Sequence, residues 1–193
     1  SNGINADYVI VAAKTDPDNN PYSVALLVVE RGMEGFERGR NLDKMGMHAQ
    51  DTAELFFNNV KVPKENCLGE PDKGFVYLME GLAEERLISA TGSAASARSA
   101  FNLTRSFVME RKVFGKPLSK MQNTEFKMAE MDTEIDIMQT YVDHSVELHN
   151  KGQLTVNMAA KAKLQATEIE WRMLDLGVQL HGGAGYMMEY PIS

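Results

Sequence analysis

The segment Leu82–Ser89, LAEERLIS, places two adjacent carboxylates and an arginine inside a stretch that is otherwise typical of a packed helix. Glu84 and Glu85 lie about 100° apart around a helix, so they face different ways and one of them is expected to be solvated. Steps of three and four from Glu85 reach leucines and then small residues: Leu78, Leu82, Ser89, Gly92 and Ser96. Such a carboxylate has room beside it for a ligand, and apolar surroundings favour its use as a base. Glu85 is therefore the candidate base; the alternative is that both glutamates are surface charges and Arg86 makes an ordinary helix ion pair.

A second candidate lies in ERKVFGKPL, residues 110–118, where Arg111 is expected in the last turn of a helix. Cations favour a helix C-terminus, and Gly115 as a left-handed cap followed by Pro117 would end the helix, so simple termination explains the segment. The functional hypothesis is that Arg111 binds a phosphate or pyrophosphate through parallel hydrogen bonds.

A third candidate is QLHGGAGYMMEYP, residues 179–191, which has three glycines within four positions. Glycines let backbone amides approach a flat or charged ligand closely, although the same residues would also serve to stop a helix. The segment lacks the Lys and Ser/Thr of a P-loop and the preceding strand of a dinucleotide-binding fingerprint.

The elements that must position these residues change character along the chain. Residues 7–15 and 23–31 are β-branched runs separated by the turn-rich DPDNNPY, which predicts a hairpin, and residues 52–63 alternate like a third strand. Residues 1–66 are thus expected to be β-rich. From residue 75 onward good helix formers dominate, and they predict helices over about 72–112, 118–150 and 155–181.

The second of these helices would be roughly 50 Å long, so the three are expected to pack as an antiparallel bundle, extended by other chains. Four methionines at helical spacing are interpreted as core: Met121, Met128, Met131 and Met138. The predicted fold class is α+β, a short antiparallel β-rich segment followed by a long antiparallel helical bundle. The predicted domains are 1–70 and 71–193.

Composition excludes several classes of function. The 193 residues are 44% hydrophobic and carry a formal charge of −7, which gives no basic surface for nucleic acid. The single cysteine, Cys67, cannot form an intrachain disulfide, and the four histidines have no zinc spacing, so no metal is expected. No apolar run approaches the roughly 20 residues of a membrane span, and the start is not typical of a signal peptide.

Taken in order, five segments resemble the acyl-CoA dehydrogenase family, most of all its long-chain members: KMGMHAQDTAELFFNNVKVP, LAEERLISA, ERKVFGKPL, QNTEFKMAEM and QLHGGAGYMMEYP. The match is collinear and covers essentially the whole chain. It implies part of a larger protein, with the end of a middle β domain, an incomplete C-terminal helical bundle, and FAD held where domains meet.

The resemblance implies α,β-dehydrogenation of a fatty acyl-CoA thioester, in which a glutamate removes the α-proton and the β-hydrogen leaves as hydride to the flavin. In the long-chain and isovaleryl branches that glutamate precedes an arginine, and it matches Glu85. The residues implied to line the acyl-CoA path are Ala83, Glu84, Glu85 and Arg86.

The resemblance also implies a set of FAD contacts, several of them to the cofactor of a neighbouring subunit: Ser1, Arg111, Phe114, Gln122, Gln179, Leu180, His181, Gly182 and Gly183. Electrons would pass to an electron-transferring flavoprotein. A homo-oligomer, dimer or tetramer, is expected, in the cytoplasm of a bacterium or the mitochondrial matrix of a eukaryote.

Three alternatives remain open from the sequence. An acyl-CoA oxidase would form hydrogen peroxide without an acceptor protein. A non-catalytic fragment would only assemble or act as a scaffold, and would bind no FAD. A relative that binds DNA would need a basic surface, which the acidic composition does not provide.

Overall fold

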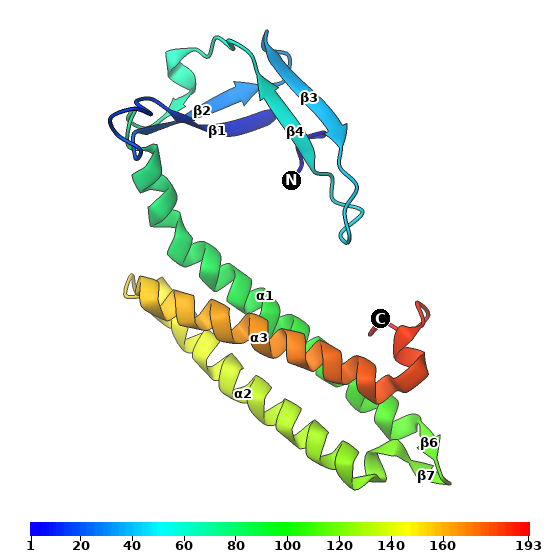
Figure 1. Cartoon of the computed structure of the whole chain (residues 1–193). Helices are drawn as coiled ribbons and strands as arrows, with labels where there is room; N and C mark the ends of the chain where they lie inside the picture. The colour runs from blue at the N-terminus through cyan, green and yellow to red at the C-terminus, as the bar shows by residue number, and fades with distance from the viewer. The chain divides into compact units, whose positions relative to one another are not determined.

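The computed structural model describes residues 1–193, and the chain divides into two compact units, Ser1–Glu80 and Gly81–Ser193. The division falls inside the first long helix, and the domain boundary expected near residue 70 stays a prediction. The elements in Figure 1 are the strands β1 (Tyr8–Lys14), β2 (Val24–Glu30), β3 (Phe36–Asn41), β4 (Ala53–Phe57), β5 (Cys67–Leu68), β6 (Lys112–Val113) and β7 (Lys116–Pro117), the helices α1 (Gly74–Glu110), α2 (Gln122–Asn150) and α3 (Val156–His181), and the 3₁₀ helices η1 (Lys64–Asn66), η2 (Leu118–Lys120) and η3 (Gly182–Tyr186).

The unit Ser1–Glu80 contains a three-stranded sheet in the order β1-β2-β5 and a two-stranded sheet of β3 and β4, all antiparallel. The predicted hairpin is confirmed, since β1 and β2 pair from Tyr8 opposite Glu30 to Lys14 opposite Val24. β3 is absent from the sequence-based expectation because its residues, FERGRN, are mostly polar. It forms as the partner of β4, and the paired rings of Phe36 and Phe57 stack with centroids 4.9 Å apart.

The turn before α1 is fastened to the β1–β2 hairpin by Asp72. Its carboxylate accepts hydrogen bonds from Oγ of Ser23, at 2.6 Å, and from the hydroxyl of Thr15. The hydrogen bond from Ser23, and then that from Thr15, lower the pKa of Asp72 because they favour the ionised carboxylate. A Cβ on Gly74, the first residue of α1, would lie 2.7 Å from the carbonyl oxygen of Val24. The helix therefore begins in close contact with β2.

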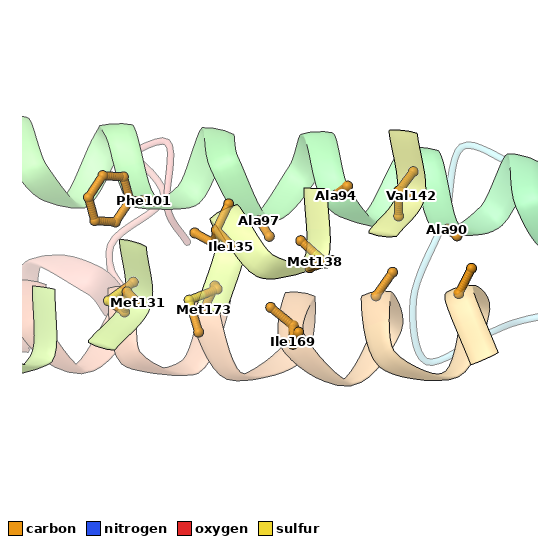
Figure 2. Close-up of a cluster of buried hydrophobic side chains, with 12 residues drawn as sticks. Ala90, Ala94, Ala97, Phe101, Met131, Ile135, Met138, Val142, Ile169 and Met173 are labelled. Carbon is orange, nitrogen blue, oxygen red and sulfur yellow. The ribbon is translucent and has the colours of Figure 1, made fainter. Parts of the chain in front are cut away.

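Three helices form the core of the unit Gly81–Ser193, and each contributes buried apolar side chains at spacings of four, three and four residues. This spacing keeps one stripe of each helix facing its neighbours, as in a coiled coil. Figure 2 shows the side chains of α2 between those of α1 and α3. The set is Ala90, Ala94, Ala97 and Phe101 on α1, Met131, Ile135, Met138 and Val142 on α2, and Ala162, Ala166, Ile169 and Met173 on α3.

The predicted bundle is thus confirmed, and so is the core role of Met131 and Met138. Met128 packs against the core, while Met121, just before α2, is half-buried. α3 begins as expected at Thr155, whose side-chain oxygen accepts a hydrogen bond from the amide of Met158 at 3.2 Å.

Ion pairs join α2 to both of its neighbours. Arg98 of α1 donates to Asp132, at 2.7 Å, and to Asp136, while Arg172 of α3 donates to Glu134 at 2.6 Å. Burial alone would lower the pKa of Arg98, but its hydrogen bonds to the two aspartates outweigh burial, so the pKa is raised. The pairs are consistent with the register set by the buried core and, being largely exposed, add little to its stability.

The end of α1 differs from the expectation in one respect. The helix stops at Glu110, and Gly115 is not its cap. Instead, Phe114 and Gly115 form the two-residue turn between β6 and β7, with φ of 50° and 81°. Positive φ at both central residues defines a type I′ turn, whose twist matches that of the strands it joins.

Candidate active site

The candidate base lies on an ordinary stretch of α1. Glu85 and Glu84 are both exposed, whereas Ala83 and Arg86 are half-buried. Glu85 makes no ion pair and no side-chain hydrogen bond within the chain, so its carboxylate is free to meet a ligand. The apolar enclosure expected around it is therefore not supplied by this helix alone.

The other predicted site residues of the helical unit gather at the opposite end of α1 and are called the far-end cluster: Arg111, Phe114, Gln122 and Gln179–Gly183. Two contacts bring them together. The amide of Leu118 donates to the carbonyl of Arg111 at 2.7 Å, which ties the start of the α2 region to the end of α1. The rings of Phe107 and His181 stack with centroids 4.1 Å apart, which ties the end of α3 to α1. Figure 1 shows β6, β7 and the C-terminus at this end.

Phe114 combines two unfavourable features at the tip of its hairpin. Its φ of 50° is in the left-handed region, which a bulky residue rarely adopts, and its side chain is 98% exposed. Asn or Asp with Gly is the usual choice for such a turn. No contact within the chain offsets the cost of this strained, exposed aromatic residue, which makes Phe114 a candidate for contact with a ligand.

Arg111 and Gln122 also have unused polar groups. Arg111 is exposed and makes no ion pair within the chain, and Gln122, the first residue of α2, is exposed as well. Because Arg111 follows α1 and precedes a rigid hairpin, its guanidinium is offered from a fixed backbone position. That arrangement suits a phosphate or carboxylate ligand.

The segment Gln179–Gly183 contains two residues that pack against the helices and three that are exposed to solvent. His181 is buried, and its Nδ1 donates to the carbonyl of Gly177 at 2.7 Å while its ring stacks on Phe107. Leu180 packs against the helical core. By contrast Gln179, Gly182 and Gly183 are exposed, and no atom lies within 4 Å of a Cβ built on either glycine. The open backbone of the two glycines is where a flat ligand could approach.

The structure does not bring Glu85 and the far-end cluster together within one chain. Both lie on or beside α1, and the 25 residues from Glu85 to Glu110 correspond to roughly 38 Å of helix. A single small reacting centre cannot touch both. The two sets are therefore separate surfaces of the helical unit.

Ser1, the remaining predicted cofactor contact, belongs to the other unit and is exposed. The residues after it are held by Asp51, whose carboxylate accepts a hydrogen bond from the amide of Ile4 at 2.7 Å and from the side chain of Asn5 at 3.2 Å. The amide of Ile4, more than the side chain of Asn5, lowers the pKa of Asp51. The role of Ser1 stays a prediction.

Two other kinds of site are not seen. No group of three or more His, Cys, Asp or Glu side chains could hold a metal ion, and no helix is both long and apolar enough to cross a bilayer. Cys67 is a free, half-buried thiol.

Comparison with known proteins agrees with the resemblance seen in the sequence. A family model described as the acyl-CoA dehydrogenase C-terminal domain matches residues 72–193. The mitochondrial long-chain specific acyl-CoA dehydrogenase of Mus musculus is 44% identical over the whole chain, which covers 45% of that protein. The chain thus spans about half the length of the relatives it matches.

Solved structures give the same result. An acyl-CoA dehydrogenase from Geobacillus kaustophilus has a TM-score of 0.94 and 50% identity, covering 99% of this chain and 51% of that one. A chain from the structure of the electron-transferring flavoprotein of Acidaminococcus fermentans has a TM-score of 0.91 and 37% identity, covering 99% and 50%. The protein belongs to the acyl-CoA dehydrogenase family, and the predicted fold class is confirmed.

Proposed function

We propose that this chain forms part of an FAD-dependent acyl-CoA dehydrogenase that converts saturated long-chain fatty acyl-CoA to the trans-2-enoyl-CoA, with Glu85 as the base. The observation that carries the proposal is that two separate surfaces of the helical unit present different unpaired groups. One face of α1 presents an unpaired carboxylate, and the far-end cluster presents an unpaired arginine, an exposed aromatic ring and open glycine backbone. These are the groups that proton removal and the binding of a flat phosphate-bearing cofactor require.

The far-end cluster fits FAD in its chemistry. Arg111 is a bidentate donor suited to a pyrophosphate, Phe114 offers a ring face, and Gly182 and Gly183 admit close backbone approach. Gln122 and Gln179 supply exposed amide groups. His181 and Leu180 act by holding that loop on the bundle, since both are packed against it.

The reaction breaks two C–H bonds and forms one C=C bond. The Glu85 carboxylate takes the proton from the α-carbon of the thioester. The electron pair of the broken α-C–H bond forms the new double bond, and the β-hydrogen leaves with the electron pair of its own C–H bond. FAD, when bound, supplies the acceptor for that hydride and is reduced by two electrons. The residues flanking Glu85 on its own helical turns, Ala83, Glu84 and Arg86, are proposed to line the acyl-CoA path.

The separation of roughly 38 Å along α1 supports a homo-oligomer in which the far-end cluster of one subunit meets the Glu85 face of another. We propose a dimer or tetramer on this ground. The proposed electron acceptor is an electron-transferring flavoprotein, a proposal supported by the similarity to a chain in the structure of the Acidaminococcus fermentans electron-transferring flavoprotein. The proposed location is the mitochondrial matrix in a eukaryote, as for the mouse relative, or the bacterial cytoplasm.

The direct test is the visible spectrum of the purified oligomeric enzyme during anaerobic titration with a saturated long-chain acyl-CoA. Bound flavin that is bleached by the substrate is the expected result. A colourless protein, or a flavin that acyl-CoA leaves oxidised, would reject the proposal. Reoxidation by oxygen with stoichiometric hydrogen peroxide would instead identify an acyl-CoA oxidase.

The role of Glu85 is tested in the same assay by Glu85→Gln. The variant should retain flavin and acyl-CoA binding, while flavin reduction slows by about 10²–10⁴-fold because the proton acceptor is lost. Glu80→Gln, an exposed glutamate of the same helix, serves as the matched control and should reduce its flavin at the normal rate. Near-normal reduction in Glu85→Gln would place the base elsewhere.

A further inference from the structure

The helix that carries Glu85 contains two interior glycines beyond its first turn, Gly81 and Gly92. Glycine inside a helix is destabilising relative to alanine, because it loses more backbone freedom on folding. Neither residue has a positive φ, so the backbone conformation does not require glycine at either position. The local backbone conformation therefore does not explain why glycine occurs at these two positions.

Packing within the chain gives no reason either. A Cβ on Gly92 would have no atom within 4 Å beyond the helix's own backbone. A Cβ on Gly81 would meet only one such atom, Oε1 of Glu85, at the ordinary contact distance of 3.9 Å. The Glu85 side chain thus lies back over Gly81, as expected for helical side chains, which point toward the N-terminus of the helix.

Both glycines also lie on the face of Glu85. At about 100° per residue, Gly81 is displaced from Glu85 by about 40° around the helix, and Gly92 by about 20°. Along the axis, Gly81 precedes the base by about 6 Å and Gly92 follows it by about 10 Å. The only group that a methyl at position 81 would contact is the carboxylate of the candidate base, whereas a methyl at position 92 would be remote from it.

We propose that Gly81 is a positioning residue for Glu85: the absence of a side chain there leaves one side of the carboxylate open, so that the α-carbon of the acyl thioester can approach it. The inference rests on the proposed function and deepens it. An alanine at this position would place a methyl group beside Oε1. That methyl group would fill the space on this side of the carboxylate, so the α-carbon would be held farther from it.

The test is Gly81→Ala in the flavin-loaded oligomer, with rapid-reaction measurement of flavin reduction over a range of acyl-CoA concentrations. The rate constant at saturation should fall about 10-fold or more, because small misplacements of reacting groups are costly. The apparent dissociation constant for acyl-CoA should change less than about threefold, since most of the ligand surface is untouched. The primary isotope effect with acyl-CoA deuterated at the α-carbon should rise, since proton removal becomes more fully rate-limiting.

Gly92→Ala is the matched control, with the same substitution on the same face of the same helix. Both variants should raise the Tm, by about 2 °C or more, because alanine is the better helix former. Only Gly81→Ala should raise the isotope effect, since Gly92 is too far from the carboxylate.

The outcomes separate the two hypotheses. If the unsubstituted enzyme is not reduced by acyl-CoA, the proposed function fails. If it is reduced normally and Gly81→Ala gains stability with unchanged reduction rate and isotope effect, the glycine is not a positioning residue and this inference alone is wrong.

Discussion

The Glu85 face of α1 and the far-end cluster, proposed to hold the base and to bind the cofactor, are built from different kinds of structure. Glu85 stands on a regular helix, and the single local irregularity beside it is a glycine that the fold does not need. The far-end cluster combines helix ends with irregular backbone: Phe114 and Gly182 have positive φ, of 50° and 59°, and His181, the last residue of α3, is buried as a packing residue. A base requires one side chain on an open face. A cofactor cradle requires backbone shaped to the ligand, and that shape needs its own support.

The support of the far-end cluster can be traced through the structure. Gly185 lies so close to α3 that a Cβ there would be 2.6 Å from the carbonyl of Val178, and Gly177 is closed in by Thr104 of α1 and by Ile192. Between the two regions, Arg98 ties α1 to α2 about halfway along the helix. The bundle is thus a spacer that holds the two regions at a fixed separation.

Among the variants considered, Gly177→Ala should have the largest effect, because it disturbs the packing that supports the far-end cluster and leaves the Glu85 face unchanged. Its Cβ would lie 2.9 Å from Oγ1 of Thr104 and 3.0 Å from Cδ1 of Ile192, so these buried side chains or the end of α3 must shift. We expect a loss of about 1–2 kcal/mol in the free energy of unfolding, after allowing for the better helix propensity of alanine. Urea unfolding of the enzyme measures this loss.

The matching control is Gly183→Ala, because no atom lies within 4 Å of its Cβ. Its free energy of unfolding should be unchanged, while flavin affinity falls because the open backbone is covered. Flavin affinity should fall in Gly177→Ala as well. Equal stability of the two variants would contradict the described packing of α3 on α1.

Phe114→Asn is expected to have a smaller and opposite effect on stability. Asparagine accepts the left-handed conformation at φ 50° more readily than phenylalanine, so the free energy of unfolding should rise by about 0.5–1 kcal/mol. Flavin affinity should fall by about 2–10-fold because the aromatic contact is lost. Calorimetry and flavin titration check the two effects, and a variant with unchanged flavin affinity would show that Phe114 serves another purpose.

The sequence predicts the helices and the first hairpin well because their signals are local. Glycines follow the ends of α2 and α3, and apolar residues recur with the period of each element, as at Met131 and Met138. β3 escapes prediction because FERGRN lacks an apolar period and becomes a strand only through pairing with β4. The type I′ turn escapes because Phe-Gly lacks the usual Asn or Asp.

The sequence proposes residues for the candidate site but does not predict how they are arranged in space. The sequence indicates Glu85, Arg111 and the glycine segment, and a helix of known rise already separates the first two. The packing role of His181 could not be foreseen, since it depends on Phe107, far away in the chain. Gly81 carries a signal that can be read from sequence, an isolated glycine inside a helical pattern, but its meaning needs the position of the Glu85 carboxylate.

If Glu85 and Arg111 of different subunits complete one active site, as proposed, mixing subunits that each lack one of them should restore activity. Glu85→Gln and Arg111→Ala, each inactive alone, are dissociated, mixed in equal amounts and reassembled with FAD. A mixed dimer would hold one intact site, so about a quarter of the unsubstituted activity should return. Homogeneous assemblies of each variant, treated identically, should stay inactive. Mixed assemblies, verified by mass spectrometry, that show no recovery would contradict the claim.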